Sequence, residues 1–205
     1  MNGSLWWELA RASGIVAWLM LTASVLWGVF LSTNLLQRRA RPAWLLDLHR
    51  WLGGLTIGFV GAHIAALVAD SFVHFGLADV LVPFASSWKA APVALGVVGM
   101  WLLVAVELSS LVMKKLPRRT WHAVHLTSYV TFWLVTFHGA LAGTDASQPL
   151  YALTSVVGVV AVVFATAYRI LAGRRGSGAP RRPRGSAPVG HRGGQAPKSQ
   201  PVPSR

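Results

Sequence analysis

Long runs of apolar residues alternate along the chain with short polar segments. Five runs of this kind, 19 to 24 residues long, occupy residues 14–36, 51–69, 90–113, 121–142 and 149–168. Only the run 90–113 contains a charged residue, Glu107. A hydrocarbon core about 30 Å thick needs roughly 20 helical residues, and buried helices of soluble proteins are usually shorter. The pattern therefore predicts an all-α membrane protein, a bundle of five transmembrane helices.

Two segments do not fit this pattern. Residues 71–89 mix large apolar side chains with Asp79 and Pro83, which predicts a short helix on the outer membrane face that caps the bundle. From Gly173 the chain is rich in Gly, Pro, Ser and Arg, and such a composition cannot bury enough surface to fold alone. We therefore expect a membrane domain over 1–172 and a disordered polybasic tail over 173–205, which either contacts anionic lipid headgroups or docks an acidic partner.

The net charge of +13 is unevenly distributed between the two sides of the predicted bundle. The loop after the first run and the loop after the third carry four basic residues each, and nine more follow from Arg169 onward. The opposite side has only Arg11 and Lys89. The positive-inside rule therefore predicts an outer N-terminus and a cytoplasmic C-terminus. A nucleic-acid partner is excluded, because the charges are split between loops and tail and no binding motif accompanies them.

Histidines mark two of the predicted spans. His49 and His63 are fourteen residues apart in or beside the second run, and His125 and His138 are thirteen apart in the fourth. Ionisable residues inside a span are costly and usually serve a site. At 1.5 Å per residue the pairs are separated by about 21 and 20 Å along helices that run in the same direction. We therefore expect His49 to meet His125 at an inner level and His63 to meet His138 at an outer level.

Two facing imidazoles at one level suit the iron of a haem held between helices. Zinc is a weaker candidate, since two histidines leave its usual three or four protein ligands incomplete. The chain has no cysteine, which excludes thiolate ligands and covalent c-type haem attachment. Two functional alternatives stay open: a histidine-lined proton or metal transporter, and a structural membrane subunit without redox activity.

One geometric point is unresolved by the sequence. Fourteen residues return almost to the same helix face, but the thirteen between His125 and His138 leave the second ring about 140° away. Taking His122 in place of His125 gives about 160°, which is no better. The helix must tilt, distort or present its ligands at different azimuths, and spacing does not choose between His122 and His125.

Two sequence motifs contain the paired histidines. They are Leu48-His49-Arg50-Trp51-Leu52-Gly53-Gly54 leading to His63, and Trp121-His122-Ala123-Val124-His125 followed by Tyr129 and His138. Both resemble the ferric reductase-like transmembrane domain family, which includes ferric reductases, NADPH oxidases and the haem-binding subunit of the bacterial periplasmic methionine sulfoxide reductase system. The likeness covers roughly 14–171. It implies two b haems with bis-histidine ligation by His49, His63, His125 and His138, and leaves His122 as an accessory.

The resemblance also implies partners and a location. Full-length oxidases of the family add a cytoplasmic FAD and nicotinamide domain, which these 205 residues lack. A separate electron donor is implied, either a flavoprotein carrying FMN or FAD or a quinol, together with an acceptor on the outer side. The chain is then the electron-transfer subunit of an oxidoreductase in the inner (plasma) membrane of a bacterium.

Weaker signals surround the histidines. Gly53, Gly54, Gly58 and Gly61 either admit a porphyrin face or let helices pack closely through Gly54 and Gly58. Arg50 and either Arg118 or Arg119 are candidates to bind the inner haem propionates, although ordinary positive-inside charges are the simpler explanation for them. Glu107 is expected to reach toward Lys114 or to orient a ligand histidine.

Overall fold

The computed structural model describes residues 2–33, 43–71 and 74–177, and within these ranges it contains helices and no strand. The helices are α1 (Asn2–Ser32), α2 (Ala43–Ala69), α3 (Leu77–Leu81), α4 (Ala90–Leu111), α5 (Arg118–Ala142) and α6 (Pro149–Ser177). The predicted all-α class is confirmed. The predicted basic residues Arg38, Arg39 and Arg41 and residues 178–205 of the predicted tail lie outside the described ranges.

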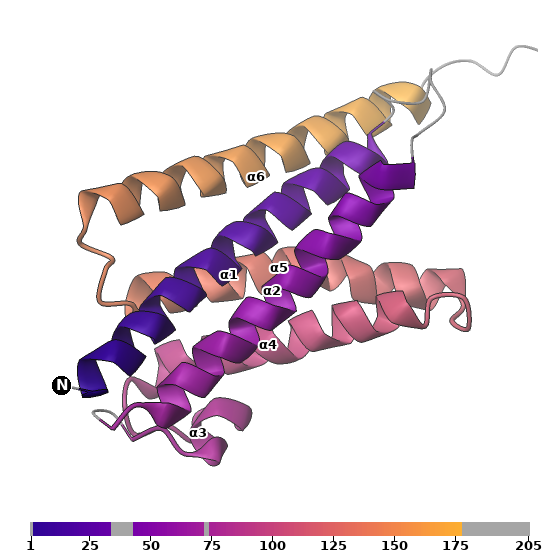
Figure 1. Cartoon of the computed structure of the whole chain (residues 1–205). Helices are drawn as coiled ribbons and strands as arrows, with labels where there is room; N and C mark the ends of the chain where they lie inside the picture. Colours follow the sequence, from indigo (N-terminus) through magenta and orange to yellow (C-terminus); the bar gives the residue numbers. More distant parts are fainter. Residues whose placement is uncertain (1, 34–42, 72–73, 178–205) are drawn as a thin grey trace, which may run out of the picture.

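The long helices form an elongated bundle of two hairpins with α6 at its side. Helix α1 packs along α2 and α4 packs along α5, while α6 lies against α1 (Figure 1). One end of the bundle holds α3, the start of α1 and the α5–α6 loop, and we call it the α3 end. The other holds the α4–α5 connection with Lys114, Lys115, Arg118 and Arg119, and we call it the basic end.

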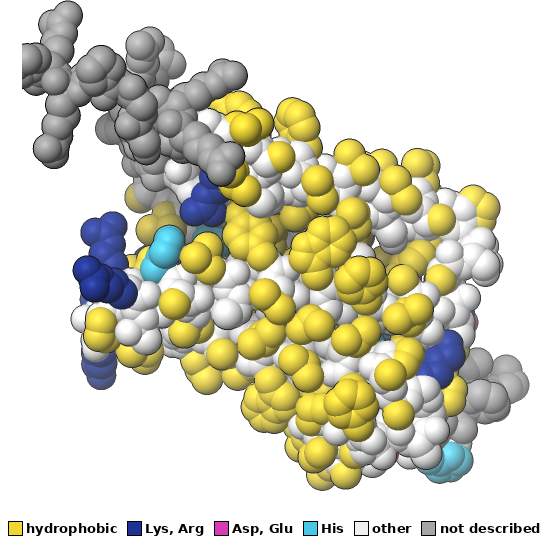
Figure 2. All heavy atoms as spheres, turned by 180° about the vertical axis from the view of Figure 1, so that it is seen from behind, with side chains coloured by type: hydrophobic (Ala, Val, Ile, Leu, Met, Phe, Trp, Pro, Cys, Tyr) yellow, Lys and Arg dark blue, Asp and Glu magenta, His cyan; other side chains and the backbone are white. Residues whose placement is uncertain are grey.

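Four helices of the described chain are long and apolar enough to cross a membrane. Their spans are Leu5–Ser32, Ala43–Ala69, Ala90–Leu111 and Pro149–Ala172. On the face seen in Figure 2, hydrophobic side chains are spread over the bundle between its ends. These features make the chain a multi-pass membrane protein by length and composition. Helix α5 has 25 residues but falls outside this set, since histidines and threonines lower its hydropathy.

Two helices extend beyond the charge-free runs that predicted them. Helix α1 begins at Asn2 and not near Gly14, because Glu8 and Arg11 are one turn apart and form an ion pair of 2.9 Å, which lets the helix carry both charges. Helix α6 continues to Ser177, five residues into the predicted tail. The short helix expected within 71–89 is present as α3.

The core lies midway along the bundle and is built from four helices. Leu21 and Val25 of α1, Leu103 of α4, Phe132 of α5 and Val162 of α6 form one buried cluster. A second cluster at the α3 end joins Phe75 and Val80 to Val93 and Val97 of α4. The central cluster fixes α5 inside the bundle, where its polar side chains are sheltered.

Candidate functional site

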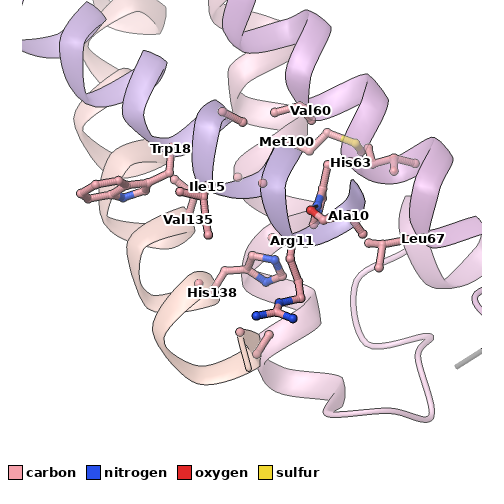
Figure 3. A pocket seen from close by; sticks show the side chains of 18 of the residues that line it. Ala10, Arg11, Ile15, Trp18, Val60, His63, Leu67, Met100, Val135 and His138 are labelled. Carbon is pink, nitrogen blue, oxygen red and sulfur yellow. Dashed lines mark hydrogen bonds between the residues drawn. The ribbon is translucent and has the colours of Figure 1, made fainter. Parts of the chain in front are cut away.

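The structure brings the four predicted histidines together as two ring pairs between α2 and α5. The ring centroids of His49 and His125 are 5.9 Å apart, with the planes at 71°. Those of His63 and His138 are 6.4 Å apart, with the planes at 85°. Figure 3 shows the second pair, one ring from each helix, projecting into a common cavity. Each pair could hold a group between its two rings.

Hydrogen bonds orient three of the four rings through Nδ1. His63 Nδ1 lies 2.7 Å from the carbonyl oxygen of Ala10, and His138 Nδ1 lies 2.8 Å from that of Pro92. A carbonyl oxygen can only accept, so Nδ1 carries the proton in both rings and Nε2 keeps its lone pair for a metal. His49 Nδ1 lies 3.3 Å from the hydroxyl of Ser24. Metal-binding histidines are usually held in this way.

The rings of α5 leave the helix at different azimuths, which answers the spacing problem. His138 contacts α4, through the Pro92 carbonyl. His125 stacks on Trp121 at 5.2 Å and 24°, on the face that also carries Tyr129. Tyr129 is bonded to Arg169 of α6, so this second face looks toward α6. A spacing of thirteen residues is therefore compatible with two ring pairs.

Two other predicted site residues are not brought to the ring pairs. His122 is exposed, and its ring lies beside Trp121, so the geometry selects His125 as the ring opposite His49. Arg50 has a side chain that is 62% exposed and pairs with Asp47 at 3.3 Å. His74 is exposed in the loop before α3, as expected for a solvated residue.

Glycines of α1 and α4 make room for three of the rings. A Cβ atom at Gly96 would lie 2.7 Å from the ring of His138, and one at Gly14 would lie 3.0 Å from His63 Nδ1. At Gly28 it would lie 3.3 Å from His49. Real Cβ atoms essentially never approach to 2.7 Å, so the ring of His138 occupies its position because residue 96 has no side chain.

The glycines expected to serve this purpose on α2 do not. Gly54, Gly58 and Gly61 are exposed, and no described atom lies within 4 Å of a Cβ placed on any of them. Gly53 is buried against the carboxyl group of Glu107. That carboxyl group has no bond to Lys114 or to a histidine within the described chain, so neither expectation for Glu107 is met.

An apolar cavity of about 220 Å³ surrounds the His63–His138 pair. Its walls include Trp18, Met100 and Val135 (Figure 3). At the α3 end Arg11 Nε donates to Asp145 Oδ2 at 2.7 Å, and a second Arg11–Asp145 bond runs in parallel. These bonds hold the pKa of the Asp145 carboxyl below its usual value. The His63–His138 pair thus lies among apolar groups, and an ion pair lies at the α3 end of its cavity.

The donor set favours a planar metal cofactor over a bare ion. Nowhere in the described ranges do three His, Cys, Asp or Glu side chains gather to hold a metal. A zinc ion would therefore lack ligands, whereas a haem iron takes four ligands from the porphyrin and needs only two from protein. Each ring pair therefore supplies the two protein ligands that a haem would need.

Several of these features escaped sequence reasoning. The Ala10 and Pro92 carbonyls are backbone groups without any side-chain signal, and Ser24, Gly14 and Gly96 lie in other helices than the histidines they contact. No protein family, curated protein or solved structure matches the chain. The site therefore rests on its geometry.

Proposed function

We propose that this protein is a membrane cytochrome b that binds two haems and passes electrons across the bilayer. His49 and His125 would ligate the inner haem, and His63 and His138 the outer. When bound, the haem supplies one-electron chemistry at iron, and the protein supplies its position and ligand field. This proposal agrees with the resemblance of its motifs to the ferric reductase-like transmembrane family.

The observation that carries the proposal is the spacing of the two ring pairs. Metal–nitrogen bonds of about 2 Å, with roughly 1 Å more from each nitrogen to its ring centre, put two axial imidazoles about 6 Å apart, centre to centre. The pairs measure 5.9 and 6.4 Å. Two histidine pairs with this separation, at two levels of one bundle, support a metal held between the rings at each level.

The surroundings of the rings support the same function. The Ala10 and Pro92 carbonyls hold His63 and His138 as the tautomer whose Nε2 can bind iron. The cavity around this pair is mainly apolar, and the polarity around a haem is one of the ways a protein sets its potential. The residues thus orient the ligands before any cofactor binds.

Five membrane crossings complete the proposal. Four helices are apolar enough by composition. We assign α5 as a further span because three of its threonine hydroxyls are satisfied by its own backbone: Thr127, Thr131 and Thr136 donate to carbonyls one turn back. The basic end then faces the cytoplasm and the α3 end faces outward.

The partners follow from the family resemblance. A cytoplasmic flavoprotein carrying FMN or FAD, or a quinol, would donate electrons, and an acceptor outside would take them. The protein would be the electron-transfer subunit of an oxidoreductase in a bacterial inner membrane. A histidine-lined proton or metal transporter is the main alternative, and it predicts a colourless protein whose transport fails when His63 is replaced.

Purification from haem-replete cells tests the proposal. The protein should show a Soret band and a sharp alpha band on reduction. His49→Ala, His63→Ala, His125→Ala and His138→Ala should each lose about one haem, while the matched controls His122→Ala and His74→Ala should keep both. A folded, colourless protein, or equal haem loss in the controls, would overturn it.

A further inference from the structure

Arg169 is a charged residue inside a candidate span that turns toward the bundle. It lies in the Pro149–Ala172 span of α6, is half-buried, and its Nη1 donates to the hydroxyl of Tyr129 on α5 at 3.0 Å. A charge within a span is costly and is normally paired. The ion pairs of the described chain involve Arg11 and Arg50, and none involves Arg169.

Three buried polar atoms near Arg169 also lack partners within the described residues. They are Trp121 Nε1, His125 Nδ1 and Thr166 Oγ1. Trp121, His125 and Tyr129 follow one another at intervals of four residues and share one face of α5. Thr166 lies one turn before Arg169 on α6. We call Trp121, His125, Tyr129, Thr166 and Arg169 the α5–α6 donor cluster.

The polar groups of this cluster are mainly hydrogen-bond donors. An indole N–H and a guanidinium can only donate, and His125 Nδ1 also donates if Nε2 binds a metal. A missing partner must therefore offer hydrogen-bond acceptors and negative charge. A buried donor left without an acceptor costs roughly 1–3 kcal/mol, so two such donors beside the unbonded hydroxyl of Thr166 point to an absent ligand.

We propose that the α5–α6 donor cluster binds a carboxylate of the haem held by His49 and His125. This rests on the proposed function, because the ring of His125 belongs both to the inner pair and to the cluster. A haem carboxylate would be tethered close to His125 and would supply the acceptors and the charge together. The role that the sequence suggested for Arg50 thus passes to Arg169, since Arg50 is exposed and paired with Asp47.

The outer level offers a contrast. Arg11 already has two carboxylate partners, Asp145 and Glu8, both from this chain. Carboxylates of this chain therefore neutralise Arg11. Arg169 has no such partner in the described chain, and an anion from outside the chain would neutralise it.

Reconstitution of the apoprotein with haem and with its dimethyl ester tests this inference. Arg169→Gln should bind the inner haem about tenfold more weakly, yet match the wild type with the ester. The midpoint potential of that haem should fall, because a nearby positive charge favours the reduced state. Arg169→Lys should recover part of the loss, and Lys115→Gln, which removes an exposed charge at the same end, should change neither.

The outcomes separate this inference from the proposed function. If Arg169→Gln folds poorly, Trp121→Phe removes one donor while keeping an aromatic ring, and it should also weaken binding of haem but not of the ester. Equal losses with haem and ester, no loss with either, or a dependence on anionic lipid in place of the haem carboxylate would overturn the cluster alone. A wild type that binds no haem would overturn both.

Discussion

At the scale of single residues, the positions of the histidine rings depend on backbone carbonyls, a hydroxyl group and a glycine. Two backbone carbonyls fix the tautomer of His63 and His138, and a serine hydroxyl contacts His49. Proline at position 92 contributes only its carbonyl, and Gly96 contributes only the absence of a side chain. The rings are thus placed by their neighbours' backbones.

Gly96 provides a direct check of this placement. Gly96→Ala puts a methyl group 2.7 Å from the ring of His138, and overpacking of this kind costs about 1–3 kcal/mol. We expect a lower thermal unfolding temperature and loss of the outer haem with the inner haem retained. Gly54→Ala is the matched control, because its Cβ meets open space and alanine favours the helix by roughly 0.5–1 kcal/mol. Equal behaviour of the two variants would refute the close contact at residue 96.

At the scale of helices, α5 is the element that makes the site possible. It is the most polar of the long helices, yet Thr131 and Phe132 are completely buried within the bundle. Trp18 of α1 donates to Thr136 at 2.9 Å, which ties the two helices together between the ring pairs. Part of its polarity is therefore used inside the bundle.

The α5–α6 loop is held to α1 by the Arg11–Asp145 pair, and this contact predicts a pH dependence. Arg11 lowers the pKa of Asp145, chiefly through their hydrogen bond. A carboxyl whose pKa is lower in the folded state adds stability above its ordinary value of 3.8, and that stability is lost as the pH falls through the folded-state value. Asp145→Asn should therefore be less stable than the wild type at neutral pH, with the difference shrinking in strong acid.

Thermal unfolding in detergent over this pH range would measure the effect. Glu8→Gln is a suitable control, because Glu8 pairs with the same arginine but has a side chain that is 63% exposed. It should cost less stability than Asp145→Asn. A difference between Asp145→Asn and the wild type that grows as the pH falls would contradict the assigned sign.

Much of the helical arrangement was predictable from the sequence, and the reasons are physical. Apolar runs located four candidate spans, and equal direction of α2 and α5 predicted which histidine meets which. The start of α1 was not predictable, because its charges are neutralised partly by Asp145, 134 residues away. The inward direction of Arg169 was not predictable for a similar reason, since its partner Tyr129 lies on another helix.

At the scale of the whole molecule, the proposal needs two redox levels joined across one bilayer. His49 and His63 are fourteen residues apart on α2, which places the two levels about 21 Å from one another along the helix. The central apolar cluster lies between them. The basic end and the α3 end then face opposite compartments.

Single introduced cysteines would test this topology, because the chain has none of its own. Ser87→Cys and Ser147→Cys, both exposed at the α3 end, should react with an impermeant thiol reagent from outside intact cells. Lys115→Cys at the basic end should react only after the membrane is opened. If α5 did not cross, Cys at 147 and 115 would react from the same side.

The most direct test of the central claim is the number of haems per polypeptide in the purified wild type. Quantifying reduced pyridine haemochrome against protein mass gives that number. Two b-type haems per chain would agree with a pair of imidazoles at each level. A value of one or none, from a folded protein made with ample haem, would contradict the account.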